Sequence, residues 1–150
     1  MTVKVIVDKP IFYLVLVGEK DFSITLERVK QFEAALDEIE SQAVEGEPSV
    51  LVTVSTAKNK FCTGFDLKWM KPQAMRGVEV YAAMLNVWSR IATFPMPTLC
   101  IINGHAFAGG LILALCHDFR IMVEDKRAKV KLSEIDLGIY LPTAISVLLK

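Results

Sequence analysis

The sequence lacks most of the features that mark a protein's class at first sight. Its 150 residues hold 17 basic and 17 acidic side chains, so no net charge attracts nucleic acid or an anionic membrane. The three cysteines are widely separated and form none of the close pairs that metal sites or redox motifs use, which favours a reduced compartment and predicts no metal site. Although 53% of the residues are hydrophobic, no apolar run reaches the roughly 20 residues of a membrane span. The apolar surface is therefore expected in a core or against a partner.

Two further absences concern targeting signals and catalytic motifs. The N-terminal MTVKVIVDKP carries a Lys and an Asp where a signal peptide needs an unbroken apolar core, and it is not the Arg- and Ser-rich helix of a transit peptide. No G-x-S-x-G occurs, and His105, His117 and Ser133 are not spaced as a recognisable triad. These absences argue against a serine hydrolase.

Hydrophobic periodicity predicts alternating strands and helices. Strands are predicted at residues 3–7, 11–17, 49–56, 98–102 and 119–123. Helices are predicted from Thr25 to about Ala43, from Arg76 to Thr93, across the apolar stretch 106–116, and from Pro142 onward. This order is typical of an α/β fold with a parallel sheet, and the length predicts one domain over residues 1–150.

Two loops carry glycine where a backbone amide could meet a ligand. In AKNKFCTGFDLKWM, Gly64 permits a tight turn and Asp66 is placed to cap a short helix. In NGHAFAGG, Gly109 and Gly110 lie at the first turn of the apolar helix. Each loop offers a backbone N–H near a helix start, and two such donors can converge on one carbonyl oxygen as an oxyanion hole. The alternative, which spacing alone favours, is that the glycines only permit turns and close helix packing.

Charged side chains suggest two further roles. Lys58, Lys60, Lys68 and Lys71 bracket the first loop, and they form either a solvated face or a receiver for the phosphates of a nucleotide-like cofactor. Glu134 lies in KLSEIDLG among isoleucine and leucine, and it is either a solvated loop carboxylate or a general base that takes and returns a proton.

The blocks KFCTGFDLKWM, PMPTLCIINGHAFAGGLILALCHDFRIM and LSEIDLGIYLP together resemble the crotonase (enoyl-CoA hydratase/isomerase) superfamily in order, separation and content. The resemblance covers essentially the whole chain and is strongest toward the Δ3,Δ2-enoyl-CoA isomerases, in particular the plant peroxisomal kind. It implies a crotonase-like α/β fold, the ββα superhelix shared with ClpP, without the C-terminal helical trimerisation region. It also implies a fatty enoyl-CoA thioester as ligand, with coenzyme A as part of the substrate and no separate cofactor.

The family motifs assign roles to individual residues. By motif, the backbone amides of Phe65 and Gly109 hold the thioester oxygen, and Glu134 is the carboxylate that moves the proton. The resemblance places substrate contacts at Thr63, Gly64, Asp66, Lys68, Gly110 and Ile112.

Position 112 distinguishes two activities. Hydratases of the superfamily carry a second glutamate on the apolar helix, where this chain has Ile112. One carboxylate can move a proton between two carbons but has no partner to orient water, so the resemblance favours an isomerase of fatty acid β-oxidation. The alternatives are a hydratase that uses Glu134 with another acid, and a non-catalytic truncated family member that acts only as an assembly partner.

The resemblance also implies an assembly and a location. A homo-oligomer, trimer or hexamer, is expected for the full-length form, with neither nucleic acid nor a membrane span involved. The family suggests the peroxisome, with the cytoplasm as the alternative, because the final LLK is not an S-K-L type address.

Overall fold

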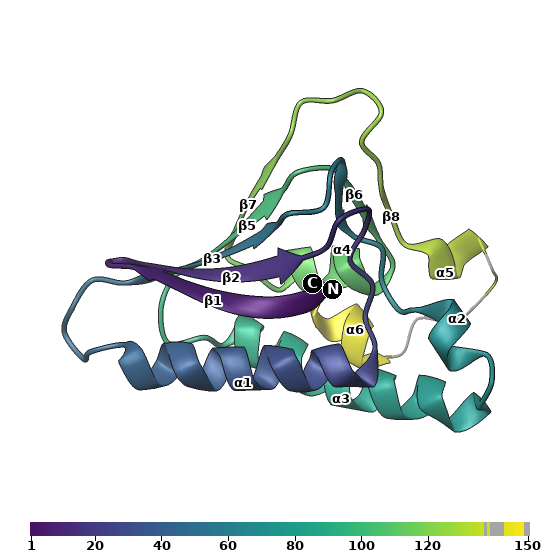
Figure 1. The fold of residues 1–150 in the computed structure, drawn as a ribbon, viewed down its shortest axis with the longest axis horizontal. Coiled ribbons are helices and arrows are strands. Elements are labelled where there is room, and N and C mark those ends of the chain that lie inside the picture. Colours follow the sequence, from purple (N-terminus) through teal and green to yellow (C-terminus); the bar gives the residue numbers. More distant parts are fainter. Residues whose placement is uncertain (137, 139–142, 149–150) are drawn as a thin grey trace.

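The computed structural model describes residues 1–136, 138 and 143–148, and within them the strands form two sheets (Figure 1). The larger sheet runs β1 (Thr2–Asp8), β2 (Ile11–Val17), β3 (Val50–Ser55), β5 (Thr98–Ile102) and β7 (Phe119–Met122). The smaller sheet runs β4 (Lys60–Cys62), β6 (His105–Phe107) and β8 (Val130–Lys131). The helices are α1 (Leu26–Gln42), α2 (Leu67–Met70), α3 (Ala74–Ala92), α4 (Gly109–Leu115), α5 (Ser133–Asp136) and α6 (Thr143–Leu148).

The larger sheet follows the predicted strands closely. β1 and β2 pair antiparallel across a short turn, whereas β2, β3, β5 and β7 are parallel, as the connecting helices require. β3 buries three consecutive residues, Leu51 to Thr53, because both of its faces are covered, which explains why its sequence shows little alternation. β7 is different, since all four of its residues are exposed, including Phe119 and Ile121.

Two long helices cover one face of this sheet (Figure 1). The Thr25 side chain caps α1 by accepting a hydrogen bond from the Arg28 amide, and the buried residues of α1 recur at three- and four-residue steps. α3 packs beside α1, and the Arg90 guanidinium on α3 bonds to the carboxylates of Glu33 and Asp37 on α1. The two helices are thus held together by an apolar interior and a charged rim.

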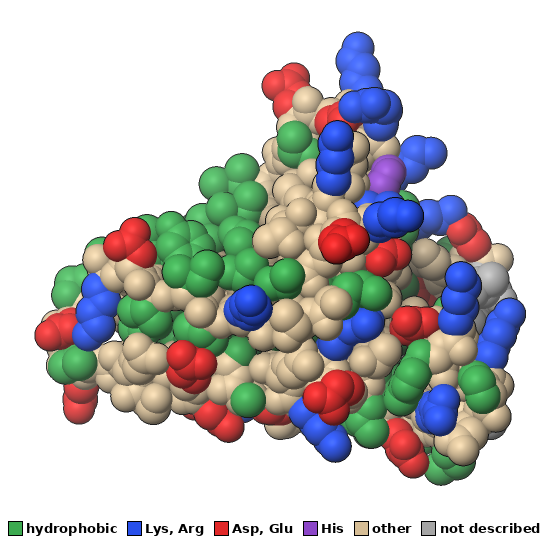
Figure 2. Space-filling model, in the orientation of Figure 1, with side chains coloured by type: hydrophobic (Ala, Val, Ile, Leu, Met, Phe, Trp, Pro, Cys, Tyr) green, Lys and Arg blue, Asp and Glu red, His purple; other side chains and the backbone are tan. Residues whose placement is uncertain are grey.

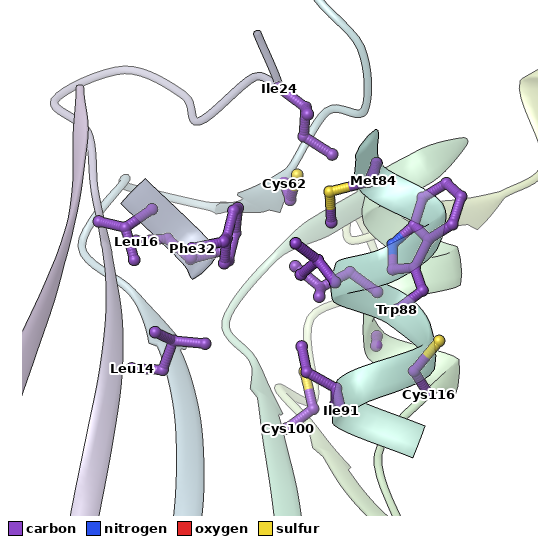
Figure 3. Close-up of a cluster of buried hydrophobic side chains, with 14 of the residues drawn as sticks. Leu14, Leu16, Ile24, Phe32, Cys62, Met84, Trp88, Ile91, Cys100 and Cys116 are labelled. Carbon is purple, nitrogen blue, oxygen red and sulfur yellow. The ribbon is translucent and has the colours of Figure 1, made fainter. Parts of the chain in front are cut away.

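The core lies between the larger sheet and these helices. Figure 3 shows Leu14 and Leu16 of β2 on one side and Met84, Trp88 and Ile91 of α3 on the other. All of these side chains are at most 1% exposed. α3 therefore supplies one side of the core.

The smaller sheet is the main departure from the sequence prediction. Residues 105–107 form a strand, so the apolar helix begins only at Gly109. KLSEIDLG, expected as a loop or strand end, contains part of β8 and all of α5. The predicted start at Pro142 and most of LGIYLP lie outside the described residues. Among the described helices, none combines the length and apolarity that crossing a bilayer requires.

Candidate active site

Three predicted site elements follow the three strands of the smaller sheet. β4, β6 and β8 are parallel neighbours, so their carboxyl ends lie at the same edge. Phe65 comes shortly after β4, Gly109 shortly after β6 and Glu134 shortly after β8. The sheet therefore brings together residues from three distant parts of the sequence.

Hydrogen bonds to residues 22–24 fix the first loop. The Ile24 amide donates to the Gly64 carbonyl at 2.7 Å, and the Asp66 amide donates to the Ile24 carbonyl at 2.9 Å. This is one parallel bridge, Ile24 to Phe65, in which Phe65's own N–H points away from residues 22–24. Within the part of the chain that the structure describes, the Phe65 amide donates to no acceptor.

A strained residue precedes the second amide. Ala108 has φ +48°, a conformation that side-chain-bearing residues rarely adopt. Its amide donates to the Lys131 carbonyl of β8 at 2.8 Å, and its carbonyl accepts from the Ile112 amide at 3.1 Å. The Gly109 amide, next along the chain, has no acceptor among the described residues. Strain of this kind is typical of sites where a backbone group must be aimed in a particular direction.

The two loops touch at Gly64. A Cβ on Gly64 would lie 2.9 Å from the Phe107 carbonyl oxygen and 3.1 Å from the Gly109 nitrogen. Gly64 also has φ +81°, so both its conformation and its surroundings require glycine. Because the Phe65 amide is bonded directly to Gly64, the two amides without acceptors are close neighbours.

Gly110 has a packing explanation. A Cβ there would lie 2.2 Å from the Cys62 carbonyl oxygen, so glycine allows α4 to approach β4 closely. Ile112, two residues further along α4, is fully buried in the core. The contacts of Gly110 and Ile112 agree with the alternative in which glycine only permits close packing of the helix. Gly109, in contrast, lies against the aromatic carbons of Phe65 and Trp88.

The remaining predicted contacts are spread along the first loop. The Thr63 amide and hydroxyl both donate to the Phe22 carbonyl, at 2.8 and 3.1 Å. Asp66 caps α2, because its carboxylate accepts from the Trp69 amide at 3.0 Å, as predicted. Lys68 is exposed on α2.

The four lysines do not form one group. Lys58 and Lys60 lie at the start of β4, while Lys68 and Lys71 follow its end. Figure 2 shows further basic side chains on the protruding β7–β8 loop, where Lys126, Arg127 and Lys129 are exposed.

Glu134 lies in the first turn of α5 and is half-buried. Its Oε2 atom is buried without a hydrogen-bond partner in the described chain. Ile135 beside it is 66% exposed, so it does not provide the apolar surroundings that the sequence suggested. Leu137 and Ile139, the other expected neighbours, lie outside the described residues.

Comparison with known proteins gives the chain a clear set of relatives. The profile of the family described as enoyl-CoA hydratase/isomerase matches residues 19–150. Peroxisomal enoyl-CoA delta isomerase 2 of Arabidopsis thaliana is 33% identical over 146 residues, which are 93% of this chain and 59% of that protein. Mitochondrial enoyl-CoA delta isomerase 1 of Mus musculus is 30% identical over 122 residues, 80% of this chain and 41% of that protein. The chain thus spans less than two thirds of the relatives it matches.

Solved structures agree on the fold. An enoyl-CoA hydratase of Mycobacterium marinum superimposes with a TM-score of 0.84 at 22% identity, over 97% of this chain and 61% of its own. An enoyl-CoA hydratase/isomerase family protein of Pseudomonas syringae gives 0.83 at 26% identity, over 97% and 60%. The predicted crotonase-like α/β fold is therefore confirmed.

Proposed function

This chain belongs to the enoyl-CoA hydratase/isomerase family, and we propose that it is the core of an enzyme that moves the double bond of an enoyl-CoA thioester from position 3 to position 2. The observation that carries the proposal is a pair of adjacent amides, at Phe65 and Gly109, that have no acceptor among the described residues and lie on the sheet edge that also holds Glu134. Amides so placed suit an oxygen that gains negative charge during a reaction.

In the proposed reaction, the thioester carbonyl oxygen accepts hydrogen bonds from the Phe65 and Gly109 amides. Glu134 removes a proton from carbon 2, and the electron pair of the broken C–H bond forms the enolate whose oxygen the amides stabilise. As the enolate collapses, the double bond forms between carbons 2 and 3, and Glu134 returns its proton to carbon 4. No water is consumed, and Glu134 ends as the carboxylate it was at the start.

Position 112 supports isomerisation over hydration. Ile112 is fully buried and carries no proton-transfer group, so the apolar helix offers no second carboxylate to orient water. The Arabidopsis relatives named delta isomerases are 33% identical. A hydratase that uses Glu134 with another acid is the alternative, and a 3-hydroxyacyl product formed from a 2-enoyl-CoA would favour it.

Replacing Glu134 with glutamine tests the mechanism. We expect Glu134→Gln to lose at least about 10²-fold in isomerase activity on 3-hexenoyl-CoA, because glutamine cannot take up the proton. Asp136→Asn is the matched control, since Asp136 is an exposed carboxylate on the same helix. Full activity in Glu134→Gln would refute the proposed role. An assay of a chain extended at its C-terminus, run beside this one, separates a wrong mechanism from an incomplete site.

A role as an assembly partner is the second candidate. It is favoured by β7, whose apolar Phe119 and Ile121 are exposed at the edge of the larger sheet. On this candidate the chain associates with full-length subunits, in the trimer or hexamer of the family, and contributes no catalysis. The mass of the chain in solution tests this, because an active, well-behaved monomer would contradict it.

The proposed location is the peroxisome, with fatty acid β-oxidation as the process. The support is the name of the Arabidopsis relative, peroxisomal, although the mouse relative is named mitochondrial. Imaging of a fluorescently tagged full-length form would test the proposal.

A further inference from the structure

The guanidinium of Arg28, in the first turn of α1, lies at one end of a series of hydrogen bonds that leads to the Phe65 amide. Its Nη1 atom donates to the backbone carbonyl of Ser23 at 2.5 Å. The Ile24 amide, next along the chain, donates to the Gly64 carbonyl at 2.7 Å. The Phe65 amide follows Gly64 and has no acceptor among the described residues. Two peptide groups therefore connect the positive charge to that amide.

Both steps of this series run through a single planar peptide group. The Ser23 carbonyl and the Ile24 amide belong to one group. The Gly64 carbonyl and the Phe65 amide belong to the next. Among the described residues the one cis peptide bond precedes Pro10, so both groups are trans, and C=O and N–H point in opposite directions in each. The two peptide dipoles are thus arranged head to tail, with their positive ends toward the Phe65 N–H.

Contacts of the Arg28 side chain hold its charge at the start of this series. Among the described residues it forms no ion pair, and its Cζ atom lies 5.8 Å from the centroid of the Phe22 ring. Nη1 also donates to the Ser23 hydroxyl at 3.0 Å. Because a guanidinium only donates, this hydroxyl directs its own proton elsewhere, to the Asp66 carboxylate at 3.3 Å. The Ser23 side chain therefore separates the guanidinium from the nearest carboxylate of the first loop.

A positive charge at the carbonyl end of such a series strengthens each hydrogen bond along it. Groups in a hydrogen-bonded chain polarise one another, by about 10–30% per bond. The guanidinium draws electron density toward the Ser23 oxygen, so the Ile24 N–H becomes a stronger donor. The same effect in the next peptide group makes the Phe65 N–H a stronger donor.

We propose that Arg28 is a positioning residue of the oxyanion hole, which directs and polarises the Phe65 amide through the two intervening peptide groups. This inference rests on the proposed function, because it assumes that a thioester oxygen accepts from that amide. The oxygen carries more negative charge in the enolate than in the bound substrate. A more strongly polarised donor therefore stabilises the enolate more than the substrate, and Arg28 should affect kcat rather than KM.

Infrared spectroscopy of bound butyryl-CoA, labelled with ¹³C at the thioester carbonyl, tests the proposal. Hydrogen bonds to a carbonyl oxygen lower its stretching frequency, so the frequency reports the strength of the donors, and the measurement requires binding but no turnover. We expect a downshift on binding to the unmodified chain, and we expect Arg28→Met to lose about 10–30% of it. In the isomerase assay on 3-hexenoyl-CoA, Arg28→Met should lower kcat about threefold with KM unchanged.

Three further variants make the measurement specific. Arg28→Lys keeps the charge and a donor, and should restore about half of the lost downshift or more. Arg90→Met is the matched control, because the Arg90 guanidinium also bonds to α1, but at Glu33, Asp37 and Glu40. It should lower stability in urea and leave the carbonyl frequency unchanged. If Arg28→Met does not fold, Arg28→Gln, which keeps a donor without the charge, takes its place.

The outcomes separate this inference from the proposed function. An unchanged carbonyl frequency in the folded Arg28→Met or Arg28→Gln chain would overturn the role of Arg28 and leave the proposed function intact. Equal changes in Arg28→Met and Arg90→Met would also overturn it, because they would show a general effect of lost stability. If the unmodified chain does not bind butyryl-CoA, or binds it without a downshift, the proposed function and this inference fail together.

Discussion

The five-stranded sheet is built from strands of four to seven residues, whereas the strands of the three-stranded sheet have two or three. The larger sheet supplies much of the core, and the smaller one ends in the three predicted site elements. β2, β3 and β5 bury side chains in that core, whereas β7 is exposed. In the smaller sheet, Phe61 and Cys62 of β4 are buried, and α4 approaches β4 closely at Gly110. The residues proposed for chemistry thus rest on the sheet with the least intrinsic stability.

The largest expected effect comes from breaking the contact between α4 and the smaller sheet. Gly110→Ala would place a Cβ 2.2 Å from the Cys62 carbonyl oxygen, so we expect a loss of about 3 kcal/mol or more in the free energy of unfolding. Gly46→Ala is the control. A Cβ there meets nothing within 4 Å, and its φ of +82° costs only about 1 kcal/mol. Urea denaturation measures both, and similar losses would contradict the difference between the two regions.

A pH effect of similar size tests the hydrogen bonds by which His117 joins α4 to the larger sheet. His117, after α4, is 3% exposed, and burial lowers its pKa to about 4. Its Nδ1–H donates to the Leu113 carbonyl at 2.9 Å, so its Nε2 accepts from the Thr53 hydroxyl of β3 at 2.7 Å. His117 takes up a proton more readily in the unfolded chain than in the folded one. The contribution of neutral His117 to the free energy of unfolding is therefore complete above about pH 6.5 and is lost as the pH falls toward 4.

This difference in pKa corresponds to a loss of about 3 kcal/mol in the free energy of unfolding between those pH values. We expect thermal unfolding across this range to show the loss in the unmodified chain and a much shallower dependence in His117→Gln. The same steep dependence in both proteins would show that other groups titrate instead.

The smallest expected effect is a gain in stability, and it tests the backbone strain at Ala108, between β6 and α4. Ala108 has φ +48°, which glycine adopts at little cost, so Ala108→Gly should stabilise the protein by about 1 kcal/mol. Ala82→Gly, the same substitution on the exposed side of α3, should destabilise it by about 1 kcal/mol. Chemical denaturation of the pair gives both signs, and a destabilised Ala108→Gly would mean that the strain is absent.

The periodic spacing of apolar residues predicted the larger sheet and the long helices, because the residues of these elements that face the core are apolar. α1 runs from Leu26 to Gln42 with Thr25 as its cap, against a predicted Thr25 to about Ala43. β2, β3 and β5 coincide with the predicted strands to within about one residue. In each of these elements, many apolar side chains contribute to the same periodic pattern.

The smaller sheet gave no such signal. β8 has only two residues, both exposed, and β6 alternates over three, so neither is long enough for a period to be seen. Glycine spacing identified the loops of Gly64 and Gly109 but could not show that they touch, because that contact depends on the pairing of β4 with β6. Likewise, only the structure shows that Trp88 of α3 packs against Gly109.

The order of the strands in the smaller sheet also bears on how the chain folds. α2, α3 and β5 lie between β4 and β6 in the sequence, and α4 and β7 lie between β6 and β8. Each pairing therefore closes a long loop whose entropy is lost before any hydrogen bond is gained. β1, β2 and α1 are adjacent in sequence and can associate early, as the chain leaves the ribosome. The sheet edge that carries the three proposed site elements is therefore completed late, when β8 docks on β6. A nascent chain that stops short of residue 130 would have most of its core but would lack β8 and the proposed site element that follows it.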